Sequence, residues 1–448
     1  MKSATRRILL GGVAIIIIAA AVGIRVVRGP GPMAFAEGPK VALADYKAAD
    51  PTGVPPSLAK ASEIARGEYL AKAADCMVCH TARGGKEYAG GLGFKLPFGA
   101  LYSTNITPDK DTGIGNYSDD DFLNALHRGV RRDGARLYPA MPYTSYTYIT
   151  DADALAIKAY LFSLPPVHAA APANTLTFPF NQRWGMIFWS ALFNPDTRFE
   201  ADTSKSSEWN RGAYLAEALA HCGECHTPRN LAFGLDNRKK FAGAVAAGWR
   251  AFNISSDKTT GIGAWHDDDL ISYLSVGHAR GHGTASGPMG EVIDQSFSEM
   301  APEDIRAVVA YLRSVPAIAS PDLPATLAPA APASHRDGGT PDPRGKMVFE
   351  GACVSCHGWT GESSISPTAT LTGAWSVNDP SATNVAQIVI AGTRRRTPEG
   401  AISMPAFGNA YSDEEIAAVA NYVTARFGSK GSQITAGDVA ALRTQASE

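Results

Sequence analysis

The longest apolar run of the chain lies at its N-terminus. Seventeen residues from Ile8 to Ile24 carry no charge; three basic residues precede them, and Arg25 and Arg28 follow. Seventeen residues lie at the short end of what spans a bilayer, and flanking arginines can reach the headgroups on both sides. The pattern predicts a transmembrane anchor or an export signal over residues 1–28.

A cleaved signal peptide is the alternative, because Ala34-Phe35-Ala36 has the small residues of a cleavage site. Twelve residues, two of them arginines, separate that site from the apolar run, which is longer than usual and favours a retained anchor. Three basic residues before the run against two after it favour a cytoplasmic N-terminus. We therefore expect the chain to face the periplasm, anchored in the inner (cytoplasmic) membrane.

Elsewhere, apolar residues recur at spacings of three and four, which predicts amphipathic helices. Ser412 with Glu415 has the form of a capping box, and Thr150 with Asp153 has the same form with a shorter acidic side chain. An Arg-Gly pair opens a further helical stretch at residues 66, 211 and 344. The three strongest closing helices are predicted at Asp151–Phe162, Pro302–Arg313 and Asp413–Arg426.

Two parts of the chain are duplicates. Residues 104–129 and 252–277 share Asn-Ile, Gly-Ile-Gly, three consecutive aspartates and a closing glycine at a constant offset of 148. A shorter third copy keeps the order of the parts. The prediction is an all-α chain with three tandem modules of the class I cytochrome c type, whose limits are 62–166 (first module), 207–317 (second module) and 340–430 (third module).

The segments between the modules differ in composition. Residues 167–206 are rich in Phe and Trp, which favours either a cover over the seam between the first two modules or a docking surface for a partner or a membrane. Residues 318–339 form an Ala/Pro-rich linker, and residues 431–448 a C-terminal tail.

The chemistry lies in the cysteines. The chain of 448 residues has six, and they form three Cys-x-x-Cys-His sequences, one in each module. Two cysteines three apart on one helical turn reach neighbouring vinyl groups of a porphyrin, and the adjacent histidine reaches the iron. Zinc needs four ligands where each motif supplies three. We expect three covalently bound haems c, attached at Cys76 and Cys79, Cys222 and Cys225, and Cys353 and Cys356, with His80, His226 and His357 as iron ligands.

A second iron ligand is expected from methionine. Met141, Met289 and Met404 follow these histidines by 61, 63 and 47 residues, each ahead of its module's closing helix. Their Pro and Gly neighbours predict stiff, non-helical loops that present sulfur to the iron. His278 or His282 could replace Met289. The basic run at residues 394–396 is expected to be a solvated loop, or to pair with haem propionates or with an acidic face of a partner.

With these motifs the chain resembles the triheme cytochrome c subunits of membrane-bound alcohol, aldehyde and gluconate dehydrogenases of acetic acid bacteria. The resemblance rests on the stretches Arg66–Leu70, Tyr102–Asp109, Tyr138–Pro142, His221–Arg229 and Thr383–Val385. It implies a catalytic dehydrogenase subunit with molybdopterin, pyrroloquinoline quinone or flavin as partner, a small Fe-S subunit beside it, and ubiquinone or a terminal oxidase as electron acceptor. The retained anchor favours an aldehyde-oxidising molybdenum partner.

The expected function is electron transfer in the periplasm, without substrate chemistry on this chain. No nucleophile, carboxylate pair or phosphate loop is recognisable. A net charge of −2 argues against nucleic acid as a partner. The alternative is a multihaem enzyme, such as a peroxidase, that acts directly on a small molecule through an open iron position.

Overall fold

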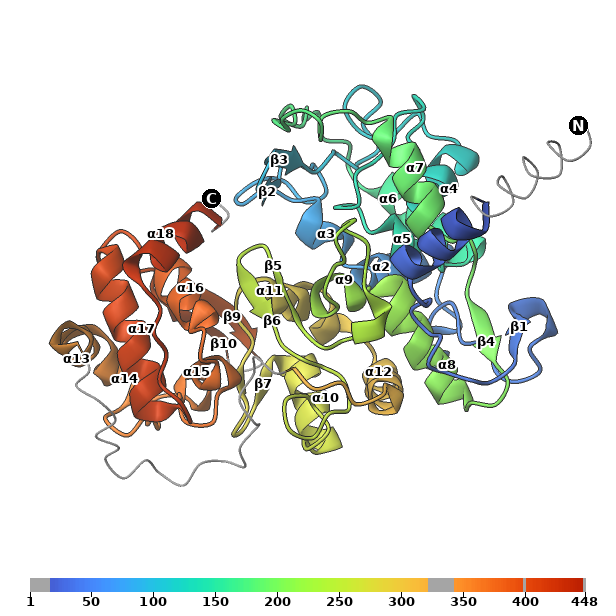
Figure 1. Cartoon of the computed structure of the whole chain (residues 1–448). Coiled ribbons are helices and arrows are strands. Elements are labelled where there is room, and N and C mark those ends of the chain that lie inside the picture. Colours follow the sequence, from blue (N-terminus) through green and yellow to red (C-terminus); the bar gives the residue numbers. More distant parts are fainter. Residues whose placement is uncertain (1–16, 321–341, 398–399, 446–448) are drawn as a thin grey trace, which may run out of the picture.

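The computed structural model describes residues 17–320, 342–397 and 400–445 and is mainly helical (Figure 1). Its first described element is a helix over residues 17–28. In these ranges no helix combines the length and the apolar character needed to cross a membrane. Residues 8–16 of the predicted anchor and residues 321–339 of the predicted second linker lie outside the described residues.

One helix crossing occurs three times. Gly67, Gly212 and Gly345 each face a backbone carbonyl so closely that a Cβ would lie only 1.9, 1.9 and 2.2 Å from it. This contact explains the Arg-Gly pairs seen in the sequence, because only glycine admits such an approach. The crossing pairs are α2 (Glu63–Ala73) with α6 (Asp151–Ser163), α8 (Ser207–Tyr214) with α12 (Pro302–Ser314), and α13 (Pro343–Val348) with α17 (Asp413–Phe427).

Shorter helices fill the rest of each module. They are α3 (Cys76–Cys79), α4 (Asp119–Arg128), α5 (Tyr143–Tyr146), α7 (Gly185–Phe193), α9 (Gly223–His226), α10 (Asp267–Val276), α11 (Gly287–Gln295), α14 (Val354–His357), α15 (Trp375–Asn378), α16 (Thr383–Ala391) and α18 (Ala436–Gln445). Two π-helical turns, η3 (Leu215–Leu219) and η6 (Phe349–Cys353), lead into the second and third cysteine motifs. Five 3-10 turns are η1 (Leu43–Asp45), η2 (Pro56–Leu58), η4 (Asn237–Lys239), η5 (Phe297–Glu299) and η7 (Pro367–Ala369).

The structure also contains short strands, which the all-α prediction did not include. The described residues contain five two-stranded antiparallel sheets, all small. They pair β1 (Lys40–Ala42) with β4 (Glu200–Asp202), β2 (Gly93–Leu96) with β3 (Gly99–Tyr102), β5 (Ala244–Ala246) with β6 (Trp249–Ala251), β7 (His278–Ala279) with β8 (Gly283–Thr284), and β9 (Thr393–Thr397) with β10 (Gly400–Met404).

The predicted caps are formed to different degrees. Ser412 and Glu415 make both bonds of a capping box at α17. Thr150 caps α6, but the Asp153 carboxylate accepts from the Gly53 N–H at 2.8 Å and the Tyr214 hydroxyl at 2.6 Å. Asp153 therefore joins two modules.

The first and second modules share one hydrophobic core, and their main polar contact is reciprocal. The Tyr69 hydroxyl donates to Asp304 at 2.6 Å and accepts from the Ala301 N–H. The Tyr214 hydroxyl donates to Asp153 at 2.6 Å and accepts from the Thr150 N–H. The duplicated modules thus pack as the two halves of an isologous dimer do.

The third module has a separate core, to which α18 contributes the buried Val439. The third module therefore continues past residue 430 into the predicted tail. Its contact with the second module is both polar and aromatic. Arg395, 4% exposed, bonds Asp294 and the Ala285 carbonyl. Trp375 packs on the core of the first two modules, edge-on to Phe252 and Trp265. The expectation of a solvated loop at 394–396 is wrong for Arg395, because this side chain is buried against the second module.

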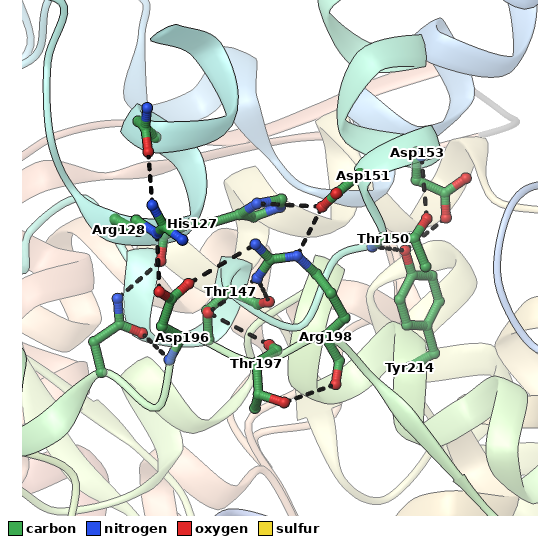
Figure 2. A network of polar contacts seen from close by, with 12 residues as sticks. His127, Arg128, Thr147, Thr150, Asp151, Asp153, Asp196, Thr197, Arg198 and Tyr214 are labelled. Atoms are coloured by element: carbon green, nitrogen blue, oxygen red, sulfur yellow. Dashed lines mark hydrogen bonds and ion pairs between the residues drawn. The ribbon is translucent and has the colours of Figure 1, made fainter. Parts of the chain in front are cut away.

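The segment 167–206 has a covered and an exposed face. On the covered side, Phe199 is buried and the indole of Trp189 donates to the Ala232 carbonyl in the second module. Arg198, next to Phe199, bonds Asp151 and the Thr147 carbonyl of the first module (Figure 2). On the exposed side, large apolar residues of and around α7 face outward, namely Phe178, Phe180, Trp184, Ile187 and Phe188.

Candidate functional site

The three Cys-x-x-Cys-His sequences follow the first helix of each crossing pair. Their six cysteines are free thiols in the structure. Burial raises the pKa of Cys76 and of Cys222 to about 12, and that of Cys225 and of Cys353 to about 11. A catalytic redox dithiol needs a depressed thiol pKa, so these pairs have the wrong electrostatics for thiol–disulfide exchange.

The three histidines after the cysteines are held alike. The Nδ1 atoms of His80, His226 and His357 lie 2.7, 2.7 and 2.6 Å from backbone carbonyl oxygens, which belong to Thr104, Phe252 and Ala369. A carbonyl can only accept, so each Nδ1 carries the hydrogen and each Nε2 keeps its lone pair. Burial lowers the pKa of all three rings, which favours the neutral form that binds a metal.

The carbonyl partners were not predicted from the sequence, although a signal exists. Thr104 and Phe252 stand directly before the repeated Asn-Ile, at the same offset of 148. The repeated stretch thus supplies the orienting acceptor in both modules.

The three methionines lie in different local structures. Met141 lies in the loop before α5, as predicted, whereas Met289 is in the first turn of α11 and Met404 ends strand β10. The prediction of a non-helical loop is wrong at Met289, because Pro288 occupies a first-turn position of α11, where proline is favoured. It is wrong at Met404 because the Pro405 that suggested a loop follows a hairpin strand.

All three methionines are half-buried against the cores that also receive the cysteines. Met141 and Met289 pack on the core that contacts Cys76 and Cys222. Met404 packs on the third module's core together with Cys353. Two thiols, one imidazole Nε2 and one thioether in each module make up a donor set that fits a covalently attached haem.

The two histidines considered as replacements for Met289 have other partners. The Nδ1 atom of His278 lies 2.9 Å from the Thr284 hydroxyl. The His282 ring stacks on Trp265 at 3.7 Å between centroids, and its Nε2 lies 3.6 Å from Asp269. These contacts favour Met289 at the second site.

The first two motifs are neighbours in the structure. The Thr144 and Ser145 hydroxyls of α5, just after Met141, donate to Glu224 inside the second Cys-x-x-Cys sequence. In return, α11, which carries Met289, contacts α3, the helix of the first motif. Each methionine-bearing segment of the pair therefore lies against the other module's cysteine motif.

A buried ion pair beside the second motif was missed. The π-turn η3 places Glu217 in the core, 2.6 Å from Lys240, and the Tyr311 hydroxyl donates to it. The offset between copies grows from 145 at Tyr69 and Tyr214 to 146 at the cysteines, and this single inserted residue is the signal that could have indicated the turn.

The His127 side chain is almost fully buried, with 1% of its surface exposed (Figure 2). Its Nδ1 lies 3.7 Å from Asp151, and its Nε2 is buried without a hydrogen-bond partner in the described structure. Burial, with the nearby Arg198, lowers the pKa of His127 to about 4.

Comparison with known proteins relates the chain to cytochromes c. Residues 64–165 match the family model for cytochrome c, and residues 341–423 match that for cbb3-type cytochrome c oxidase subunit III. The chain is 40% identical to the fructose dehydrogenase cytochrome subunit of Gluconobacter japonicus, over 88% of this chain and 85% of that protein. It is 38% identical to the gluconate 2-dehydrogenase cytochrome c subunit of Pantoea cypripedii, over 85% and 89%. It is 36% identical to the alcohol dehydrogenase (quinone) cytochrome c subunit of Gluconobacter oxydans, over 85% and 82%.

Proposed function

The chain belongs to the family of cytochrome c subunits of dehydrogenases, and from this premise we propose that it is a triheme electron-transfer subunit. Three haems c would be attached through the cysteine pairs named above, with His80, His226 and His357 on one side of the irons. Met141, Met289 and Met404 would bind on the other side. When bound, each haem c supplies a one-electron couple whose reduced state thioether ligation stabilises.

One observation carries this proposal: the same histidine arrangement occurs three times. In each module a carbonyl holds Nδ1 of a half-buried ring, and two cysteines that form no disulfide lie within four residues. The chain's own residues thereby orient three imidazoles with Nε2 available to an iron, as electron transfer through bound haem requires.

The names of the relatives support the choice of partner. We propose that the chain receives electrons from a catalytic dehydrogenase subunit that oxidises an alcohol or an aldehyde, with a small Fe-S subunit in a molybdopterin-type complex. It would pass them to ubiquinone or a terminal oxidase. The apolar run at residues 8–24 supports a place on the periplasmic face of the inner membrane.

Substitution of the methionines tests the ligand scheme. Met141→Leu, Met289→Leu and Met404→Leu should each remove one third of the absorption band that a thioether gives on ferric haem. Met347→Leu is the matched control, because Met347 is 62% exposed on α13 and should leave the band unchanged.

Substrate-driven reduction tests the assignment as a subunit. The complex purified from membranes should show haem reduction on adding ethanol, acetaldehyde, gluconate or fructose without oxygen, and reoxidation on adding a short-chain quinone. A wild-type protein without the thioether band, which consumes peroxide by itself, would instead be a haem enzyme that acts directly on a small molecule.

A further inference from the structure

A cavity of about 640 Å³ opens where the N-terminal helix meets the second module. Its lining comes from the end of helix 17–28 and the Gly29–Pro32 turn, from α5 and α7, and from residues 229–238. The Asn230 side chain donates to the Val27 carbonyl, and the Asn237 side chain donates to the Pro30 carbonyl. Helix 17–28 is thus fastened beside α7, as Figure 1 also shows.

The cavity has a cationic rim. Four arginines line it, at residues 25, 28, 229 and 238. Arg229 is paired with Glu224 and Arg238 with Asp236. The side chains of Arg25 and Arg28 have no hydrogen bond or ion pair within the described part of the chain. Glu217, the one carboxylate in the lining, is bound by Lys240, so the cavity offers two uncompensated guanidinium groups.

The walls and the surroundings of the cavity are apolar. Trp189, Phe193 and Leu235 line it. Outside, the exposed apolar side chains of α7 continue across Phe98, which stacks on Phe180 at 3.9 Å and meets Phe233 edge-on at 6.1 Å. Leu231 is fully exposed, and Ile24, Val26 and Val27 of the N-terminal helix are 40–58% exposed. Exposed apolar side chains that gather on neighbouring segments mark a contact with a membrane or another protein.

We propose that this cavity binds the phosphate headgroup of an anionic phospholipid, with the acyl chains along the apolar patch. One guanidinium group can donate two parallel hydrogen bonds to the oxygens of a phosphate. Basic pockets at a membrane surface select anionic headgroups. The net negative charge of an anionic headgroup complements the two unpaired arginines, whereas a zwitterionic headgroup brings its own cation and leaves their charge uncompensated. The assignment of phospholipid as the phosphate source rests on the membrane location proposed above.

Native mass spectrometry of the delipidated full chain tests the site directly. Phosphatidylglycerol should bind to one saturable site, and phosphatidylcholine of equal chain length should bind at least about tenfold more weakly, because its headgroup has no net charge. R25Q/R28Q should lower the phosphatidylglycerol affinity by about tenfold or more. R131Q/R132Q, a pair of arginines in a loop of the first module, is the matched control and should bind as the wild type does.

Three outcomes would overturn the proposal. Equal binding of both lipids, or unchanged binding to R25Q/R28Q, would remove the headgroup site. Inorganic phosphate that binds as well as the lipid would make this a free-phosphate site. If a short-chain quinone displaced the lipid and bound R25Q/R28Q as well as the wild type, the cavity would be a site for the neutral quinone ring. Haem content, measured on the same samples, should stay unchanged in R25Q/R28Q, so a failure of the proposed function would be seen separately.

Discussion

The first two modules and the third module are joined by different kinds of contact. The first pair shares one core and exchanges buried Tyr–Asp bonds across it, through Tyr69 with Asp304 and Tyr214 with Asp153. The third module has its own core and contacts the second through Arg395, through the ring of Trp375, and through Asn384, which bonds both backbone groups of Arg250. The two repeats that resemble each other most in sequence thus share one hydrophobic core, whereas the divergent copy has its own.

Removal of the cysteines should show this difference most strongly. C353A/C356A should keep two haems per chain, because the third core is separate. C222A/C225A should leave fewer than two, since its motif lies against α5 of the first module within the shared core. A pyridine haemochrome assay per chain measures both. Two haems per chain in each double variant would show that the first two modules mature independently.

Two buried arginines should contribute differently to the free energy of unfolding. Arg211 holds Asp304, the acceptor of Tyr69 at the first interface, through Nε and Nη2 at 2.8 and 2.6 Å, and the Asp304 side chain is 2% exposed. Arg211→Met should therefore lower the free energy of unfolding of the first pair by about 3–5 kcal/mol, because it leaves a buried carboxylate unpaired.

Arg395→Met is the comparison variant. Its partner Asp294 is 13% exposed and closer to water, so the loss should be smaller and confined to the docking of the third module. Denaturant titration followed by haem absorbance measures both variants. If Arg395→Met lowered the stability of the first pair as much as Arg211→Met does, the division into a pair and an attached module would be wrong.

The first module should also have an acid-sensitive group at a position where its duplicate has none. His127 is buried and neutral, with its pKa lowered to about 4, and the corresponding residue of the second module is Ser275. An unfolded chain protonates this histidine below about pH 6.5, while the folded chain does not until about pH 4. The contribution of His127 to stability is therefore complete above pH 6.5 and is lost as the pH falls towards 4.

Between pH 7 and pH 4.5, this effect of His127 should lower the free energy of unfolding by about 2–3 kcal/mol. The charged side chains that face the ring are those of Arg198, Asp151, Asp196 and Arg128. His127→Gln should remove that part of the pH dependence, as measured by denaturant unfolding at the two pH values. His168→Gln, which changes a side chain that is 69% exposed, should not. Equal slopes in the wild type and His127→Gln would contradict the assignment.

The smallest effects concern the helix caps. Ser118 and Ser412 each close a full capping box, one in the first module and one in the third. Ser118→Ala and Ser412→Ala should each cost about 1 kcal/mol of unfolding free energy. If the modules unfold as described, Ser118→Ala should shift the transition of the first pair and Ser412→Ala only that of the third. A single transition shifted equally by both variants would indicate one cooperative unit.

Local patterns predicted the helices well. Helix α6 begins at the predicted Asp151 and ends at Ser163, one residue beyond the prediction, because apolar spacing and an N-cap are properties of neighbouring residues. The cysteine motifs were equally visible. The orienting carbonyls of Thr104 and Phe252 were present in the repeat, but nothing local linked them to histidines 24 and 26 residues earlier.

The sequence patterns did not predict the long-range contacts. Asp153 fits a cap, yet its carboxylate bonds Tyr214, 61 residues later, and this choice depends on how two modules pack. Arg395 lies in a basic run that resembles a solvated loop, and only docking against the second module buries it. Pro288 is compatible with a loop or with a helix start, and the surrounding structure selects the helix.

The central claim is that each of the three equivalent cysteine–histidine motifs holds one haem. The most direct measurement is the haem content per intact chain, by pyridine haemochrome, combined with mass mapping of the haem-bearing peptides. We expect three haems per chain, one each on the peptides with Cys76 and Cys79, Cys222 and Cys225, and Cys353 and Cys356. Any other number, or an unmodified cysteine pair in the mature protein, would contradict the account.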